Sequence, residues 1–109
     1  MGMTDRTEPV LLKTEIKHLQ AFLQAAVGHF QIGEDAAGMK DFLSAMEELK
    51  RLVEISRNSQ PQIDLNLLLP SVRRLYFYMK NQDITGITDL LNDTVYPLTE
   101  KWIKGRDDT

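Results

Sequence analysis

The chain contains no cysteine, which excludes disulfide bonds, thiolate metal sites and cysteine nucleophiles. Its aliphatic runs, such as Leu67–Leu69, fall far short of the roughly 20 apolar residues that span a bilayer. The opening residues Met1–Arg6 are polar and lack the apolar core of a signal peptide. We therefore expect a cytoplasmic protein that has no membrane segment.

An excess of basic residues is also missing. Lysine and arginine number 13 against 16 aspartate and glutamate residues, and the net charge is −3. Proteins that bind nucleic acid draw much of their affinity from basic side chains that neutralise phosphates. The sequence therefore predicts no nucleic-acid partner.

Helical periodicity is abundant. Apolar residues recur every three or four positions in four segments, separated by short breaks at Gly33, Asn58–Pro61 and Asn81–Asp83. This pattern predicts helices over about 8–32, 35–57, 62–81 and 84–104 and no strand. Because short connections make consecutive helices antiparallel neighbours, we expect an all-α, up-down-up-down antiparallel four-helix bundle. Residues 8–104 would form one domain, preceded by a disordered N-terminus or cloning remnant at 1–7 and followed by a frayed tail at 105–109.

Each predicted helix has a core stripe. The first stripe consists of Leu12, Ile16, Leu19, Leu23, Ala26 and Phe30. The second consists of Met39, Phe42, Leu43, Met46, Leu49 and Val53, with Gly38, Ala45 and Leu52 on a flank that permits close approach of another backbone. The third consists of Leu65, Leu68, Leu69, Val72, Leu75, Tyr76 and Met79. The fourth consists of Ile84, Ile87, Leu91, Val95, Leu98 and Trp102.

The helix ends follow from capping residues and prolines. Thr7 is expected to cap the first helix, with Pro9 in its first turn, and Asp83 to cap the fourth. Gly33 and Gly105 are expected to stop the first and fourth helices. Pro70 is expected to bend the third helix, unless that helix begins near Leu69, and Pro97 to kink the fourth near Asp93.

Catalytic patterns are lacking. The serines do not occur in Gly-x-Ser-x-Gly, and the glycines match neither a phosphate loop nor a dinucleotide fingerprint. Glu15 and His18 have the Glu-x-x-His spacing of metal-binding bundles, but those bundles use two such motifs and two further glutamates. Both residues are expected on a solvated flank of the first helix. The sequence predicts no enzyme and no cofactor, and a metal- or small-ligand-binding bundle that uses Glu15 and His18 stays an alternative.

The third helix has two apolar sides. Opposite its core stripe lie Ile63, Leu67, Pro70, Phe77 and Tyr78, with Arg74 among them. A helix that is apolar nearly all round is normally buried on more than one side. Aromatic residues beside arginine are typical of interface hot spots. We therefore expect a protein interface that contains Ile63, Leu67, Arg74, Phe77 and Tyr78, although half-exposed aromatic side chains and a non-helical lead-in before Pro70 would also fit the pattern.

Two resemblances bear on this interpretation. The stretches Gly38–Leu49, Asp83–Leu91 and Pro97–Leu98, together with Trp102, resemble small helical bacterial proteins of unknown function. This resemblance covers about two-thirds of the chain and implies a helical bundle without a known activity. The run Leu75–Met79 and the late Trp102 are similar to flagellar export chaperones, which implies a partner helix bound in an apolar groove, although the spacing is shorter here and the N-terminal pattern of those chaperones is missing.

The sequence as a whole predicts a non-catalytic protein–protein interaction or adaptor module. Its simplest partner is a second copy of the chain, because symmetric dimers are the commonest oligomers. An export-chaperone-like binder of a partner helix is a further alternative.

Overall fold

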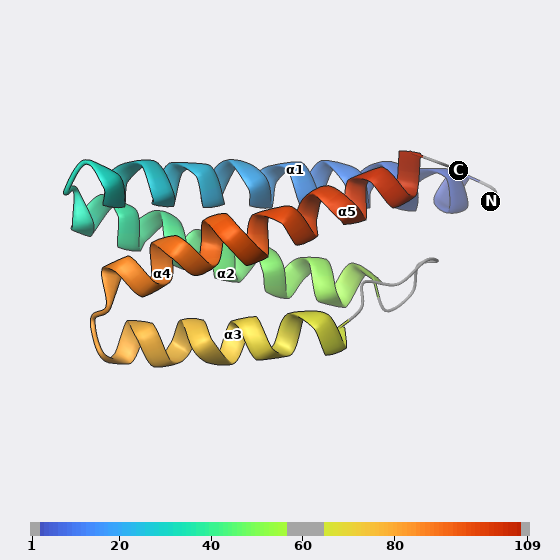
Figure 1. Ribbon diagram of the computed structural model, residues 1–109. Helices are drawn as coiled ribbons and strands as arrows, with labels where there is room; N and C mark the ends of the chain where they lie inside the picture. Colours follow the sequence, from blue (N-terminus) through green and yellow to red (C-terminus); the bar gives the residue numbers. More distant parts are fainter. Residues whose placement is uncertain (1–2, 57–64, 108–109) are drawn as a thin grey trace.

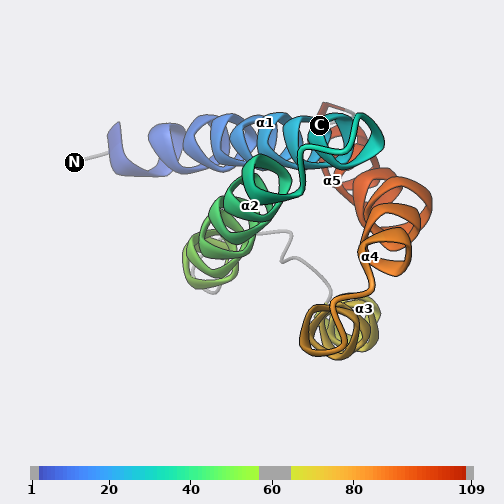
Figure 2. The same cartoon turned by 90° about the vertical axis from the view of Figure 1, so that its left-hand side faces the viewer.

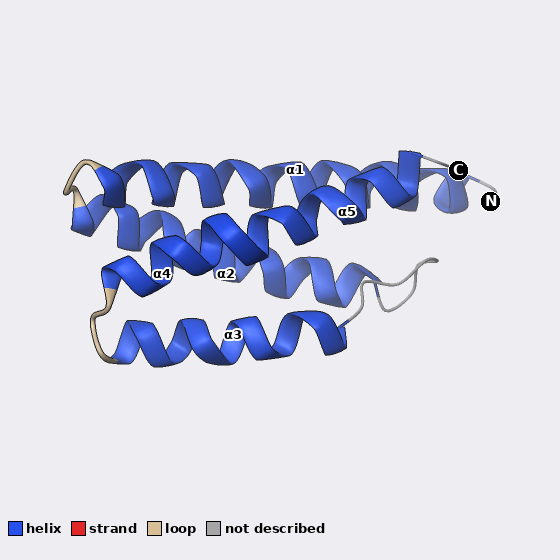
Figure 3. Ribbon diagram, viewed as in Figure 1, coloured by secondary structure: helices blue, strands red, loops and turns tan. Residues whose placement is uncertain are grey.

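The segments with apolar periodicity fold into helices, and the all-helical prediction is confirmed. The computed structural model describes residues 3–56 and 65–107, and the side chains of residues 12–56 and 68–104. Within these ranges there is no strand (Figure 3). The elements are α1 (Met3–Gln31), α2 (Asp35–Ser56), α3 (Leu65–Lys80), α4 (Ile84–Leu90), the π-helical turn η1 (Leu91–Val95) and α5 (Tyr96–Asp107).

Helix α1 runs along one edge of the molecule and packs against both α2 and the continuous stretch α4–η1–α5 (Figures 1 and 2). Helix α3 packs mainly against α4 and η1. The turns between α1 and α2 and between α3 and α4 lie at the same end of the molecule (Figure 1). Residues 57–64, which connect α2 to α3, lie outside the described residues, so the up-down-up-down order of the helices stays a prediction.

The core stripe of α1 is confirmed, because every predicted member is buried. These residues are Leu12, Ile16, Leu19, Leu23, Ala26 and Phe30. The α4–η1–α5 stretch meets them with Ile87, Leu90, Leu91, Val95, Thr99 and Trp102. The side chains between the helices thus form one continuous apolar core.

The inward side of α2 is shifted from the predicted stripe towards its small-residue flank, although Phe42 and Leu49 of that stripe are buried as predicted. Its buried residues include Gly38, Ala45 and Leu52, whereas Leu43, expected in the core, is 49% exposed. The reason is close packing: a Cβ atom at Gly38 would lie only 2.5 Å from Cδ1 of Phe30. Small residues let α2 approach α1, and this approach sets the rotation of α2 about its own axis.

Both described turns end their helices in the same way, with one residue in the left-handed region. At the end of α1 this residue is Gly33, with φ of 82°, as predicted, and the Glu34 N–H donates to the His29 carbonyl at 2.8 Å. At the end of α3 it is Gln82, with φ of 54°, and the Asp83 N–H donates to the Tyr78 carbonyl at 2.8 Å. This is the Schellman pattern, which satisfies carbonyls that the helix leaves without partners.

The expected distortion before Pro97 takes the form of the π-helical turn η1. Pro97 lacks an N–H, and its ring would collide with the Asp93 carbonyl in a regular helix. The wider turn relieves this collision, and the Tyr96 N–H donates to the Leu91 carbonyl instead. Because a π-turn holds more residues than an α-turn, the helix beyond it is rotated. Thr99 is fully buried there, and Leu98, predicted in the stripe, is only half-buried.

Several helix ends differ from the prediction. Helix α1 begins at Met3, so Thr7 lies inside it and is not its cap, and Pro9 lies beyond its first turn. Helix α5 continues past Gly105 to Asp107. Helix α3 runs through Pro70 and therefore begins before it. The Asp83 cap is confirmed, because its Oδ1 accepts a hydrogen bond from the Gly86 N–H at 2.9 Å.

Candidate functional site

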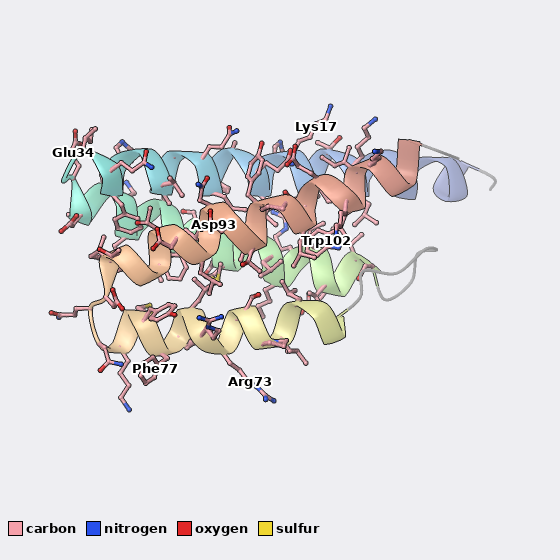
Figure 4. The ribbon with its side chains drawn as sticks, in the orientation of Figure 1. Lys17, Glu34, Arg73, Phe77, Asp93 and Trp102 are labelled. Atoms are coloured by element: carbon pink, nitrogen blue, oxygen red, sulfur yellow. The ribbon has the colours of Figure 1, made fainter. Side chains whose placement is uncertain are left out.

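Helix α3 exposes large apolar side chains to solvent. Phe77 is 64% exposed and Tyr76 61%, and Leu69 is also exposed. Figure 4 shows Phe77 and Arg73 pointing away from the other helices. We call Leu69, Arg73, Tyr76 and Phe77 the outer face of α3. Such a cluster is where a soluble protein can bind a partner.

The predicted interface residues separate into two groups. Phe77 lies on the outer face and is exposed. Tyr78 is half-buried against the core, and a Cβ atom at Gly86 of α4 would come within 2.8 Å of its ring. Arg74 is bound to Tyr78: its Nη2 donates to the tyrosine hydroxyl at 3.0 Å, and its Cζ lies 5.9 Å from the ring centroid.

Tyr78 therefore belongs to the contact between α3 and α4, and Arg74 covers it from outside. Phe77 makes an edge contact with Tyr78 at a centroid distance of 6.1 Å. This contact places the exposed Phe77 ring beside a ring that is already packed. Ile63 lies outside the described residues, and Leu67 belongs to α3 but its side chain lies outside the described side chains.

Leu68 and Leu75 of the predicted α3 stripe are buried as expected, whereas the predictions for Leu69 and Tyr76 are wrong, because both are exposed and Ser71 is buried beside the core leucines. Tyr76 borders a small apolar hollow of about 50 Å³ between α2 and α3, where it meets the exposed Leu43. The remaining lining residues are Phe42, Met46, Leu75 and Met79. The exposed apolar surface thus extends from α3 towards α2.

A second group of residues lies between α1 and α2. One carboxylate oxygen each from Glu15 and Glu48 and one ring nitrogen of His18 lie within 4.8 Å of one another. We call these residues the Glu15–His18–Glu48 cluster. Glu15 and Glu48 are each only 6% exposed, whereas His18 is exposed. Glu15 was expected on a solvated flank of its helix, and this expectation is wrong because α2 covers it.

The two glutamates are incompletely paired. Glu15 Oε2 and Glu48 Oε1 are buried and have no hydrogen-bond partner within the part of the chain that the structure describes. The other oxygen of Glu15 lies 3.6 Å from Arg51 Nη2, whose side chain is 64% exposed. Burying an ionised carboxylate without a partner is costly, so such groups normally take up a proton or bind a cation.

Sequence reasoning missed Glu48 because the core side of α2 is shifted from the predicted stripe towards the flank of Gly38, Ala45 and Leu52. A signal for it was present. Glu48 lies three residues after Ala45 and four before Leu52, on the flank of small residues that permits close helix packing. Once that flank faces α1, Glu48 is turned towards Glu15. The Glu15–His18 spacing was noted from the sequence, but its third member comes from another helix.

The remaining histidine serves a different contact. His29 Nδ1 lies 2.6 Å from Asp41 Oδ2, so this pair joins the end of α1 to the start of α2. His18 and His29 are 11 residues apart on α1, which separates them by about 16 Å along the helix axis. The two histidines therefore do not share a site.

No protein-family model, curated protein or solved structure matches the chain. In the described ranges, none of the helices combines the length and apolar character needed to cross a membrane.

Proposed function

We propose that the protein is a non-catalytic protein–protein interaction module of the cytoplasm that self-associates through the outer face of α3. The observation that supports this most directly is Phe77. Its ring is 64% exposed on the outer face, yet it packs edge-on against the half-buried Tyr78. A large aromatic side chain held beside a packed neighbour loses little freedom on binding, which is what makes aromatic residues effective interface anchors.

The arrangement of α3 supports a second copy as the partner. Because α3 packs mainly against α4 and η1, one side of it is left uncovered. In a two-fold dimer the same patch occurs on both sides of the interface, so the apolar residues of one copy are covered by those of the other. Arg73 would then remain at the hydrated rim.

The charge of α3 provides a way to distinguish self-association from binding to a different, acidic protein. Helix α3 contains Arg73, Arg74 and Lys80 and no acidic residue, although the whole chain has a net charge of −3. Two α3 helices that meet would therefore repel each other electrostatically, and salt would weaken this repulsion. Self-association should thus become stronger as ionic strength rises, whereas binding to an acidic partner should become weaker.

The test is the mass of the protein in solution, measured by sedimentation equilibrium at low and high salt. We expect a dimer for the parent chain and a monomer for Phe77→Lys, because the substitution puts a charge at the centre of the interface. Ile32→Lys is the matched control: Ile32 is 68% exposed but lies in the turn between α1 and α2. A parent chain that stays monomeric at all concentrations, or a dimer that survives Phe77→Lys, would refute self-association through α3.

A further inference from the structure

We propose that Glu15, His18 and Glu48 bind one divalent first-row transition-metal ion between α1 and α2. This site is independent of the outer face of α3. Its basis is the convergence of three ligand atoms within 4.8 Å together with two carboxylate oxygens that are buried and unpartnered.

The carboxylates need a positive charge that the protein supplies only in part. Arg51 Nη2 approaches one oxygen of Glu15 at 3.6 Å, beyond the length of a good hydrogen bond, and its side chain is mostly exposed. Glu15 Oε2 and Glu48 Oε1 remain without a partner. A divalent cation would satisfy both glutamates at once, and the arginine could swing into solvent.

His18 distinguishes a transition-metal site from a proton shared by two glutamates. A shared proton would need only the carboxylates, whereas an imidazole nitrogen beside two carboxylate oxygens is a ligand set suited to Zn²⁺, Mn²⁺, Fe²⁺ or Co²⁺. Because His18 is exposed and Glu48 borders an open surface hollow of about 420 Å³, an ion can reach the cluster from solvent.

Only a small adjustment of side chains is required. Ligand atoms around a tetrahedral Zn²⁺ at about 2.1 Å lie about 3.4 Å apart. The ligand atoms, now within 4.8 Å of one another, would therefore have to move closer together, and the exposed His18 is the side chain with most room to do so. Three protein ligands would leave at least one position for water.

The helices hold the ligands at fixed positions. Glu15 and His18 are three residues apart on α1, so they lie on neighbouring turns of one side. Glu48 is held in position by α2, because Ala45 and Leu52, which precede and follow it on the same side of the helix, are buried. The ion would therefore join α1 to α2 at a point where their packing leaves two acidic groups in the interior.

The experiment is a titration of the untagged, metal-free chain with Zn²⁺, followed by calorimetry. We expect one Zn²⁺ per chain and a Kd raised roughly tenfold or more in His18→Gln and in Glu48→Gln, since even outer-shell changes at metal sites cost about 10–100-fold. His29→Gln is the matched control, because it removes the other histidine of the chain and should leave the Kd unchanged. His18 is exposed, so its variant tests the site even where Glu48→Gln alters folding.

Co²⁺ provides a second readout, because its visible absorption bands report the coordination number and should disappear in His18→Gln. Phe77→Lys should bind Zn²⁺ as the parent does, so failure of the metal site and failure of the dimer are distinguishable. Parent chain that binds neither ion, equal Zn²⁺ affinity in the parent and His18→Gln, or loss of binding only in His29→Gln would each overturn the proposal.

Discussion

The contact between Gly38 and Phe30 leads to a quantitative prediction about two glycines that look alike in the sequence. Gly28 lies in α1 and Gly38 in α2. Replacing a glycine inside a helix by alanine stabilises the helix by about 0.5–1 kcal/mol, because alanine has less conformational freedom in the unfolded chain and therefore loses less of it on folding. If helix propensity alone mattered, both substitutions would stabilise the protein equally.

The surroundings of the added methyl group differ. At Gly28, apart from the adjoining residues and the backbone of the helix itself, no atom lies within 4 Å of the position that a Cβ would take, so Gly28→Ala should be stabilising by the full amount. At Gly38 the Cβ would lie 2.5, 2.6 and 2.9 Å from three carbons of the Phe30 ring. This ring is buried and cannot move into solvent. Overpacking of this kind costs about 1–3 kcal/mol, so Gly38→Ala should lower the free energy of unfolding by about 1 kcal/mol after the gain in propensity.

The propensity gain cancels when the two variants are compared, and their difference of about 1–3 kcal/mol isolates the cost of separating α1 from α2. Urea unfolding followed by circular dichroism at 222 nm measures it, provided that the m value stays constant. If Gly28→Ala and Gly38→Ala are equally stabilising, the close approach of α2 to α1 is wrong, and so is the rotation of α2 that buries Glu48.

Two further predictions concern the turn between α3 and α4. Gln82→Gly should be stabilising by about 0.5–1 kcal/mol, because it removes the steric cost of a side chain at φ of 54°, and a higher Tm would report it. A lower Tm would mean that Gln82 does not occupy the left-handed region. Asp83→Ala should be destabilising by about 1 kcal/mol in urea unfolding, since the Gly86 N–H loses its acceptor, whereas Asp83→Asn should retain most of the stability. Equal losses in both Asp83 variants would contradict the capping role.

Much of the fold could be predicted from apolar periodicity. The core stripe of α1 is correct because large aliphatic residues recur on one side only. For α2 the same reasoning was correct for Phe42 and Leu49 but wrong for Leu43, because the core side is shifted towards Gly38 and Ala45. Side-chain size predicts which residues can be buried, but the partner helix decides whether a small residue allows a closer and therefore more favourable contact.

The candidate sites were predictable to different degrees. The spacing within α3 places Phe77 opposite the core, and the structure leaves it exposed. The inward position of Tyr78 depends on Gly86 in another helix, which periodicity within α3 cannot reveal. The same limitation applies to Glu48. A site built from two helices requires their relative rotation, and that rotation depends on packing that no single segment specifies.

The π-helical turn η1 determines where the chain could lose a residue without moving its core side chains. A turn of this kind is equivalent to one extra residue within an α-helix. A chain one residue shorter between Leu91 and Val95, in which Pro97 is also replaced by a residue with an N–H, could close into a regular α-helix and still present Thr99 and Trp102 to α1. Elsewhere in α4 or α5, the same loss would turn every later side chain by about 100° and remove Trp102 from the core.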